Sequence, residues 1–253
     1  MIEHVLIDAD IVAYRCSAAT ENDAEDIAHW QASEMVRRIV HETNAMQYHL
    51  YLTGSDNFRY SVYPDYKANR KDVPKPTWLQ SVRAHLVTEW GAKVINGIEA
   101  DDQLGIDQMM YDGTSIIASI DKDLLMIPGF HYNFVKQEMR TVSPLEGLRH
   151  FYTQLIMGDR SDNIPGYDGK MRVKVPKFLE ADVAYLEECM SESEMFEHVA
   201  SMYDAGIGRE QLVINGKLLW IMRKENDHWN PPPKSLTENI MVEHGLQLGS
   251  MPS

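Results

Sequence analysis

The sequence predicts an α/β fold in which a mostly parallel central sheet is covered by helices. Short apolar segments rich in β-branched residues or leucine are typical of strands, and the longer segments between them carry apolar residues at the three- and four-residue spacing of amphipathic helices. Because strands and helices alternate along the chain, helical crossovers between parallel strands are the natural arrangement. At 253 residues, 44% of them hydrophobic, the chain is long enough to bury a substantial core.

The predicted elements begin in the order strand, helix, strand, helix, strand, helix, strand, and the rest of the chain is mainly helical. Turn residues at 164–169 and a proline-rich break at 231–233 interrupt the helical part, and the break precedes a tail. We expect a core at residues 1–180 and a helical C-terminal region with a tail at 181–253. Strands are expected at 5–7, 49–52, 93–95 and 115–120, and helices at 23–42, 77–90, 101–111 and 145–157.

The formal charge of −14 at first argues against binding to nucleic acid, which usually requires a basic surface. The charge is unevenly distributed, however. Residues 59–75 carry five cations against two acids, residues 170–177 carry four cations and no acid, and residues 180–197 carry seven acids and no cation. The acidic stretch is typical of a solvated helical face, so the net charge does not exclude two local basic surfaces.

Other features bear on the compartment in which the protein is expected. The sequence has no run of about 18 apolar residues, and it starts with MIEHVLIDAD, whose early acids do not suit a signal peptide. Cys16 and Cys189 lie far apart and form no CxxC or Cys/His spacing, which argues against a disulfide framework or a structural zinc site. We expect a cytoplasmic protein.

Acidic side chains follow each predicted strand at or near its end. They are Asp8, Asp56, Glu99 and Asp121. Because the carboxyl ends of parallel strands meet at one edge of a sheet, these acids are expected to share a site. Carboxylates about 4–6 Å apart raise one another's pKa unless a cation neutralises them, and hard divalent ions prefer oxygen ligands. The pattern therefore indicates a Mg²⁺ or Mn²⁺ site.

The first local group of acids is Glu99-Ala-Asp101-Asp102, directly before a predicted helix. A single acid there is commonly a helix cap that complements the helix dipole. Three acids in four residues exceed what capping needs, so a metal-binding role is the stronger interpretation.

Two further groups follow along the chain. Asp121 and Asp123 come after a predicted strand, although the same pattern is common in solvated turns. Asp159 and Asp162 lie in GDRSDNIPG after a predicted helix, where turn formers are also frequent. A calcium-binding EF-hand loop does not fit, because its sixth position would be Ile164 and not glycine, and its twelfth position would not be glutamate.

Six short motifs occur in a fixed order from Asp8 to about Lys177. They are Asp8 with Tyr14-Arg15, Phe58-Arg59, Tyr63 with YKANR at 66–70, EADD at 99–102, DKDL at 121–124, and GDRSDNIPG at 158–166. Together they resemble the 5′ nuclease family, which includes flap endonucleases, the 5′ nuclease domain of bacterial DNA polymerase I and small phage-encoded exonucleases. Each motif alone is weak, but six in this order are specific.

The resemblance implies a PIN-like 5′ nuclease core and a site for two divalent ions. In such sites one ion lowers the pKa of the attacking water, and a second about 4 Å away stabilises the leaving 3′ oxygen. The products would carry a 5′ phosphate and a 3′ hydroxyl. The acids that match the family's metal-site positions, directly or through water, are Asp8, Glu99, Asp101, Asp102, Asp121, Asp123, Asp159 and Asp162.

The resemblance also implies a gateway segment at about residues 59–90, beneath which single-stranded 5′ ends pass. Lys67 and Arg70 match the family's active-site lysine and arginine, whose charge can offset that of the phosphate in the transition state. Aromatic side chains among the cations would allow stacking without sequence preference. DNA-binding residues are expected in the gateway segment and near 170–177: Arg59, Tyr66, Lys71, Lys170, Arg172, Lys174 and Lys177.

The chain departs from the family pattern at two places. The family usually has an aspartate at the end of the second strand, where this chain has Thr53, so either Asp56 reaches in from three residues later or that ligand is missing. The helix–two-turn–helix expected at about 157–180 lacks the second glycine of its hairpin, which argues against the bound potassium ion often found there.

We therefore expect a Mg²⁺-dependent 5′–3′ exonuclease or 5′-flap endonuclease that hydrolyses DNA in replication, repair or recombination. Its expected partners are DNA with 5′ ends, flaps or branched duplex, and replication proteins. We expect a monomer without membrane association, in a bacterial cytoplasm or a phage-infected cell. Two alternatives remain: a PIN-type ribonuclease, which shares the acid-lined α/β core, and a non-catalytic scaffold that binds branched nucleic acid.

Overall fold

A six-stranded sheet forms the centre of the computed structural model, which describes residues 2–233. Its strand order is β3-β2-β1-β4-β5-β6, and every neighbouring pair is parallel except β5 and β6. This arrangement confirms the predicted α/β fold class. The strands are β1 (His4–Asp8), β2 (Gln47–Asn57), β3 (Lys93–Gly97), β4 (Ser115–Ala118), β5 (Gly129–Asn133) and β6 (Glu138–Val142).

The hairpin of β5 and β6 was not predicted. Four of the five side chains of β6 are exposed, since it is an edge strand, so it has no apolar pattern that the sequence could reveal. Helix α1 (Ala9–Ala19) was also missed; it starts directly after β1, with Asp8 as its N-cap. Strand β4 ends at Ala118, earlier than predicted, so Asp121 lies in the connection that follows it.

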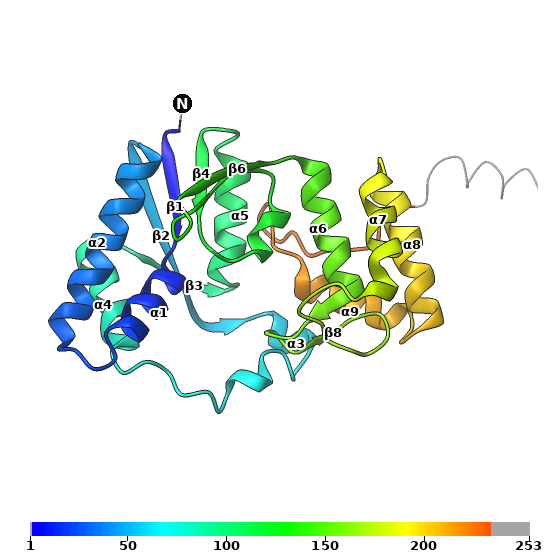
Figure 1. Cartoon of the computed structure of the whole chain (residues 1–253), viewed down its shortest axis with the longest axis horizontal. Coiled ribbons are helices and arrows are strands. Elements are labelled where there is room, and N and C mark those ends of the chain that lie inside the picture. The colour runs from blue at the N-terminus through cyan, green and yellow to red at the C-terminus, as the bar shows by residue number, and fades with distance from the viewer. Residues whose placement is uncertain (1, 234–253) are drawn as a thin grey trace, which may run out of the picture.

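Helices cover both faces of the sheet, as Figure 1 shows. Alternate residues of β1 point to opposite faces: Val5 and Ile7 pack with α1, α2 and α4, whereas Leu6 packs with α5 and with the helical C-terminal part. The remaining helices of eight or more residues are α2 (Glu25–Thr43), α4 (Leu79–Trp90), α5 (Ala100–Met110), α6 (Pro144–Met157), α7 (Glu180–Glu188), α8 (Glu192–Ala205) and α9 (Arg209–Leu219).

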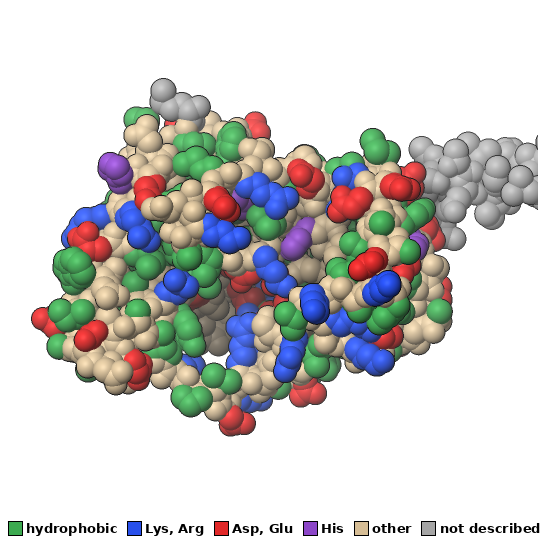
Figure 2. All heavy atoms as spheres, viewed as in Figure 1, with side chains coloured by type: hydrophobic (Ala, Val, Ile, Leu, Met, Phe, Trp, Pro, Cys, Tyr) green, Lys and Arg blue, Asp and Glu red, His purple; other side chains and the backbone are tan. Residues whose placement is uncertain are grey.

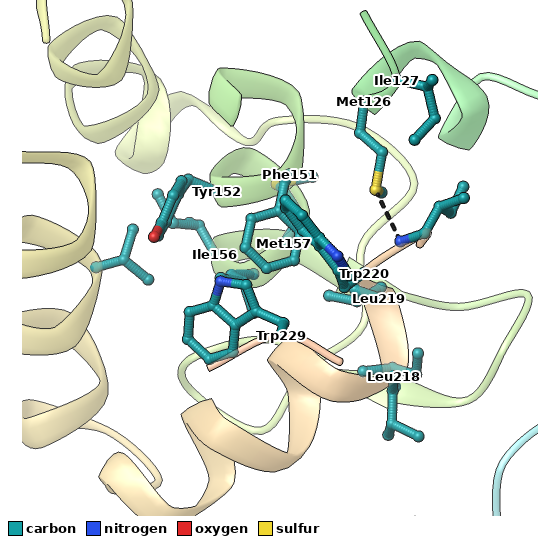
Figure 3. Packing of buried hydrophobic residues seen from close by; sticks show 14 of the residues in the cluster. Met126, Ile127, Phe151, Tyr152, Ile156, Met157, Leu218, Leu219, Trp220 and Trp229 are labelled. Atoms are coloured by element: carbon teal, nitrogen blue, oxygen red, sulfur yellow. Dashed lines mark hydrogen bonds between the residues drawn. The ribbon is translucent and has the colours of Figure 1, made fainter. Parts of the chain in front are cut away.

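The C-terminal helices share a hydrophobic cluster with α6. Phe151 of α6 contacts two tryptophans, with ring centroids 5.0 Å from Trp220 and 5.5 Å from Trp229 (Figure 3). A larger side chain at Gly216 of α9 would collide with Trp229, because an added Cβ would lie 2.0 Å from its ring. Residues 181–233 are thus packed onto the rest of the chain, and most of the predicted tail lies outside the described residues.

The segment between α6 and α7 is built from turns. Two short antiparallel strands, β7 (Gly158–Asp159) and β8 (Ile164–Pro165), close a loop that carries the predicted acids of this region. This segment ends in the 3-10 helix η3 (Lys177–Leu179), and other short helices are α3 (Arg59–Val62), η1 (Ala68–Arg70) and η2 (Asp123–Met126). Within residues 2–233, no helix has the length and apolar character needed to cross a bilayer.

A buried ion pair joins three distant parts of the chain. Arg59 at the start of α3 forms two hydrogen bonds with Asp102 of α5, of 2.6 and 2.9 Å, and two more with the main-chain oxygens of Leu218 and Trp220, each 2.8 Å. Asp102 also accepts hydrogen bonds from the main-chain nitrogens of Glu99 and Met222. Both side chains are at most 2% exposed.

This placement differs from two predictions. Arg59 was expected to contact DNA, but it is buried and all its bonds go to protein groups. Asp102 was expected at the metal site, but its oxygens accept from Arg59 and from main-chain nitrogens. Both residues therefore hold the fold together.

We expect Arg59→Met to lower the free energy of unfolding by about 3–5 kcal/mol, because it leaves the Asp102 carboxylate buried without a cation. Chemical denaturation at pH 7 measures the change. Arg209→Met is the matched control: Arg209 is half exposed and pairs with Asp204 at the surface, so we expect a change within about 0.5 kcal/mol.

The pH dependence supplies a second criterion. In the native protein burial opposes the charge of Asp102, but Arg59 holds its pKa below the usual range, so this carboxylate contributes stability that is lost as pH falls. In Arg59→Met the guanidinium no longer lowers that pKa, and burial, opposed only by the hydrogen bonds from the nitrogens of Glu99 and Met222, raises it, so the variant should regain stability as pH falls. A deficit that grows towards acidic pH would contradict the assigned role of the pair.

Candidate active site

Predicted acids from the ends of several strands lie together at one edge of the sheet. Asp8 ends β1, Asp101 lies in the first turn of α5 after β3, and Asp121 follows β4. Burial raises the pKa of Asp101 well above its usual range, and the nearby charges of Asp8, Asp121 and Glu99 raise it further. The structure thus brings these side chains close enough to repel one another, as expected for the carboxyl ends of neighbouring parallel strands.

A second group of acids lies next to the first and shares Asp121 with it. Asp123 accepts a 2.6 Å hydrogen bond from Gln154 of α6, and burial together with Asp121 and Asp159 raises its pKa to about 8. Burial acts in the same direction on Asp159, but the hydrogen bonds from Ser161 lower its pKa overall. The site therefore extends from β1 to the loop after α6.

Hydrogen bonds fix the orientation of Asp8. One carboxylate oxygen accepts from the Ser119 hydroxyl at 2.7 Å, and the other accepts from the main-chain nitrogen of Ile11 at 3.1 Å. Burial raises the pKa of Asp8 to about 7 despite these bonds, and the charges of Asp10 and Asp121 contribute. The charge of Asp121 acts on the pKa values of both Asp8 and Asp123, so Asp121 lies near each of them.

The gateway segment contacts further acids of the site through Lys67 and Arg70. Lys67 forms an ion pair with Glu99 and lies 3.6 Å from Asp162, and Arg70 pairs with Asp162. Burial opposes the charge of Lys67, yet Glu99 and Asp162 raise its pKa above the usual value. Tyr66 is 1% exposed and donates to Glu99 and Asp162, so its ring is not available for the predicted contact with DNA.

At the end of β2 the structure argues against the first of the two alternatives, that Asp56 reaches into the site. Asp56 is exposed, in the irregular part of β2 between Thr53 and Asn57, and it is not among the charges that act on the pKa values of Asp8, Asp101 or Asp123. Asp10, which was not predicted, lies here instead: it accepts a 2.8 Å hydrogen bond from the nitrogen of Thr53 and pairs with Arg83 of α4. The signal in the sequence was the second acid in the Asp8-Ala-Asp10 segment.

The predicted DNA-binding cations near residue 170 are of two kinds. Arg172 is largely buried, pairs with Asp168 and lies over the rings of Tyr167 and Phe178. The others remain open to solvent, together with one cation of the gateway segment. These exposed side chains are Lys71, Lys170, Lys174 and Lys177.

The donor set fits a hard divalent cation, because it consists of crowded carboxylate oxygens. Figure 2 shows acidic side chains inside a hollow near the middle of one face, with Lys and Arg side chains around it. Within residues 2–233, no three acidic, His or Cys side chains already converge as ligands of one ion. Instead the carboxylates are held by Ser119, Gln154, Ser161 and Lys67, so ion binding would require rotation of some of them.

Solved structures of the same fold come from bacteriophage T5. The T5 D15 flap endonuclease, solved as a pseudo-enzyme-product complex with DNA and metal ions, has a TM-score of 0.64 and 16% identity, over 87% of this chain and 88% of that one. The T5 5′-exonuclease with bound zinc has a TM-score of 0.55 at 16% identity, over 87% of this chain and 99% of that one. At this level of identity the likeness concerns the fold alone.

Proteins with similar sequences are named as 5′ nucleases. A 5′-3′ exonuclease of Buchnera aphidicola is 30% identical over 138 residues, which is 49% of this chain, and the match spans only 48% of that protein. The flap endonuclease Xni of Shewanella sp. (strain W3-18-1) is 28% identical over 187 residues, covering 67% of this chain and 71% of that protein. The family model of the 5′-3′ exonuclease N-terminal, resolvase-like domain matches residues 3–152, more than half of the 253 residues. The chain therefore belongs to the 5′-3′ exonuclease family.

Proposed function

We propose that this protein is a divalent-metal-dependent 5′ nuclease that hydrolyses phosphodiesters at DNA 5′ ends and flaps. The observation that carries the proposal is the convergence of Asp8, Asp101, Asp121 and Asp123 at the edge of the sheet, next to Lys67 of the gateway segment. Relatives in the family support it, since those matched are named 5′-3′ exonuclease and flap endonuclease.

Two overlapping groups of carboxylates are proposed to hold Mg²⁺ or Mn²⁺. The first is Asp8, Asp101 and Asp121, and the second is Asp121, Asp123 and Asp159. Bound ions would supply activation of the attacking water and neutralisation of charge on the leaving oxygen. Asp121 would serve both groups.

The cations of the gateway segment are proposed to hold the substrate phosphate. The Lys67 ammonium lies at the boundary between the acids and the gateway segment, where its three hydrogens can be shared between Glu99, Asp162 and a phosphate oxygen. Arg70 is half exposed, so part of its guanidinium remains accessible beside Asp162. The exposed Lys71, Lys170, Lys174 and Lys177 would contact phosphates farther along the strand.

The decisive experiment is Asp121→Asn, which we expect to slow magnesium-dependent cleavage at least about 100-fold. Binding of a 5′ flap in calcium should change little, because the substitution alters the metal site and not the phosphate contacts. Gel mapping of products from a 5′ flap, a blunt duplex and single-stranded RNA measures cleavage and separates the DNA nuclease from a ribonuclease.

Asp56→Asn is the matched control for that experiment. It makes the same chemical change at an exposed carboxylate outside the cluster, so cleavage should be unchanged. Equal activity of the two variants would exclude the proposed metal site.

We expect Lys67→Ala to reduce the single-turnover cleavage rate more than it weakens DNA binding, because the Lys67 charge lies near Asp101 of the proposed metal site. Lys71→Ala, at an exposed lysine four residues farther along the gateway segment, should do the reverse. It should weaken binding, reduce the slope of log K against log salt by about 1, and leave the single-turnover rate unchanged. If Lys67→Ala weakened DNA binding and left the single-turnover rate unchanged, Lys67 would not have the proposed catalytic role.

Divalent metal binding should weaken as pH falls from about 9 to about 6, because Asp8 and Asp123, with pKa values of about 7 and about 8, must lose protons to bind an ion. Calorimetry in two buffers of different ionisation enthalpy measures the protons released on binding. Proton release on metal binding should be substantial near pH 7 and small above about pH 9. If no protons were released at any pH in this range, the raised pKa values of Asp8 and Asp123 would be contradicted.

The same shifts fix the sign of the stability change. Because the folded pKa values of Asp8 and Asp123 lie above the unfolded value of about 3.9, the metal-free protein should lose stability as pH rises from about 4 to about 8. Thermal unfolding in EDTA measures this loss.

A further inference from the structure

A pocket with several basic side chains lies along α6, the helix whose Gln154 contacts Asp123 of the candidate active site. It has a volume of about 260 Å³ and is bounded by β6, α6 and α7. Its polar lining comprises Arg140, Glu146, Arg149, His150, Thr153 and Glu187. None of these residues belongs to the carboxylate cluster or to the gateway segment.

The pocket is adjacent to the carboxylate cluster. His150 precedes Gln154 by four residues on α6, so the two side chains lie about one helical turn apart on the same side of the helix. Gln154 donates to Asp123, and Lys122, between Asp121 and Asp123, lies close enough to His150 to affect its pKa. A group bound at His150 would therefore be a neighbour of a group bound at Asp123.

His150 presents a polar atom without a protein partner. Its Nε2 is buried and makes no hydrogen bond within the described residues. Burial lowers the pKa of His150 to about 4, and Lys122 and Arg140 act in the same direction, so the ring is neutral at pH 7. A neutral ring with its hydrogen on Nε2 is a donor, and leaving a buried donor unsatisfied costs about 1–3 kcal/mol.

The charges around His150 favour an anion. Arg149 is held by the main-chain oxygens of Leu186 and Cys189, and its nearest acid is Glu187, at 3.6 Å and 62% exposed. Arg140 is 55% exposed, and its nearest acid is Glu146, at 3.8 Å. One oxygen of Glu146, Oε2, accepts from the nitrogen of Ser143 in the cap of α6, which leaves only Oε1 near Arg140. With Lys122, three cations stand against two solvated acids.

We propose that this pocket binds a phosphate group of the nucleic acid strand, one or two nucleotides from the phosphate that is cleaved. Arg140 and His150 would donate to its oxygens, and Lys122 and Arg149 would contribute charge. The position follows from spacing, because one helical turn of about 5.4 Å corresponds to one or two nucleotides at about 3.4 Å each. The proposal rests on the nuclease function proposed above, and it adds a specific contact to it.

The test replaces single phosphates of a 5′-flap substrate with neutral methylphosphonate linkages and measures binding in calcium. For the native protein we expect one linkage, one or two nucleotides from the cleavage position, at which the replacement weakens binding about tenfold. Arg140→Gln should weaken binding of unmodified DNA by a similar factor, lower the salt slope by about 1, and abolish the penalty at that linkage alone.

The variants are chosen to keep the fold intact. Arg140 lies on an exposed edge strand, so Arg140→Gln should have the same free energy of unfolding as the native protein. His150→Gln is a second variant that should also abolish the binding penalty at the modified linkage. Arg149 is unsuitable, because it holds the main chain at the end of α7. Arg37→Gln, an exposed arginine on α2, is the matched control and should leave the penalty in place.

The possible results are distinct. If both pocket variants keep the full penalty at every linkage, the pocket contacts no phosphate of the strand and the inference is wrong. If inorganic phosphate shifts the NMR signals of His150 at millimolar concentration while the linkage penalties stay unchanged in the variants, the pocket binds free phosphate and the strand contact is excluded. Native protein that neither binds nor cuts DNA would overturn the proposed function itself, whereas cutting without the linkage effect overturns only the pocket.

Discussion

The buried pair of Arg59 and Asp102 is the interaction on which the geometry of the site depends. It connects the first residue of the gateway segment to the start of α5 and to the chain after α9. Asp102 also accepts from the nitrogen of Glu99, so the same carboxylate fixes the turn that carries Glu99 and Asp101. An isolated cation or acid at this depth would be strongly unfavourable, and therefore the three segments can only be buried together.

The acids of the site fall into two parts that differ in how their charge is compensated. Glu99 and Asp162 already have cations beside them, Lys67 and Arg70, supplied by the gateway segment. In contrast, the ion pairs found among residues 2–233 include none with Asp8, Asp101, Asp121 or Asp123. Burial raises the pKa values on that side, and it also raises the pKa of Asp162, although Lys67 and Arg70 oppose it there. The acids without a paired cation therefore have the greater need for a divalent ion. On the other side, Lys67 and Arg70 can present their charge to a phosphate.

The sequence was sufficient for the parts of the molecule that depend on local pattern. Alternating strands and helices predicted the parallel sheet, and the strand-end pattern predicted that Asp8, Glu99 and Asp121 would share a site, although it also included the exposed Asp56. It was insufficient where a distant partner decides the outcome. Arg59 and Lys71 look alike in the sequence, since both lie in the same basic segment. Arg59 is buried because it pairs with Asp102, 43 residues away, whereas Lys71 is exposed to solvent. The hairpin of β5 and β6 was missed for a different reason, since an exposed edge strand carries no apolar pattern.

The end of β2 shows how a departure from the family pattern alters the site. Thr53 stands where an acid was expected, and its hydroxyl accepts from the nitrogen of Ala100, which helps to fix the start of α5. The carboxylate near this position comes from Asp10, but Arg83 pairs with it and also binds the main-chain oxygen of Thr53. The charge that an acid on β2 would contribute is thus largely neutralised. We infer that the attraction for divalent ions is weaker on the β2 side of Asp8 than around Asp121 and Asp123, where no such cation pairs with the acids among the described residues.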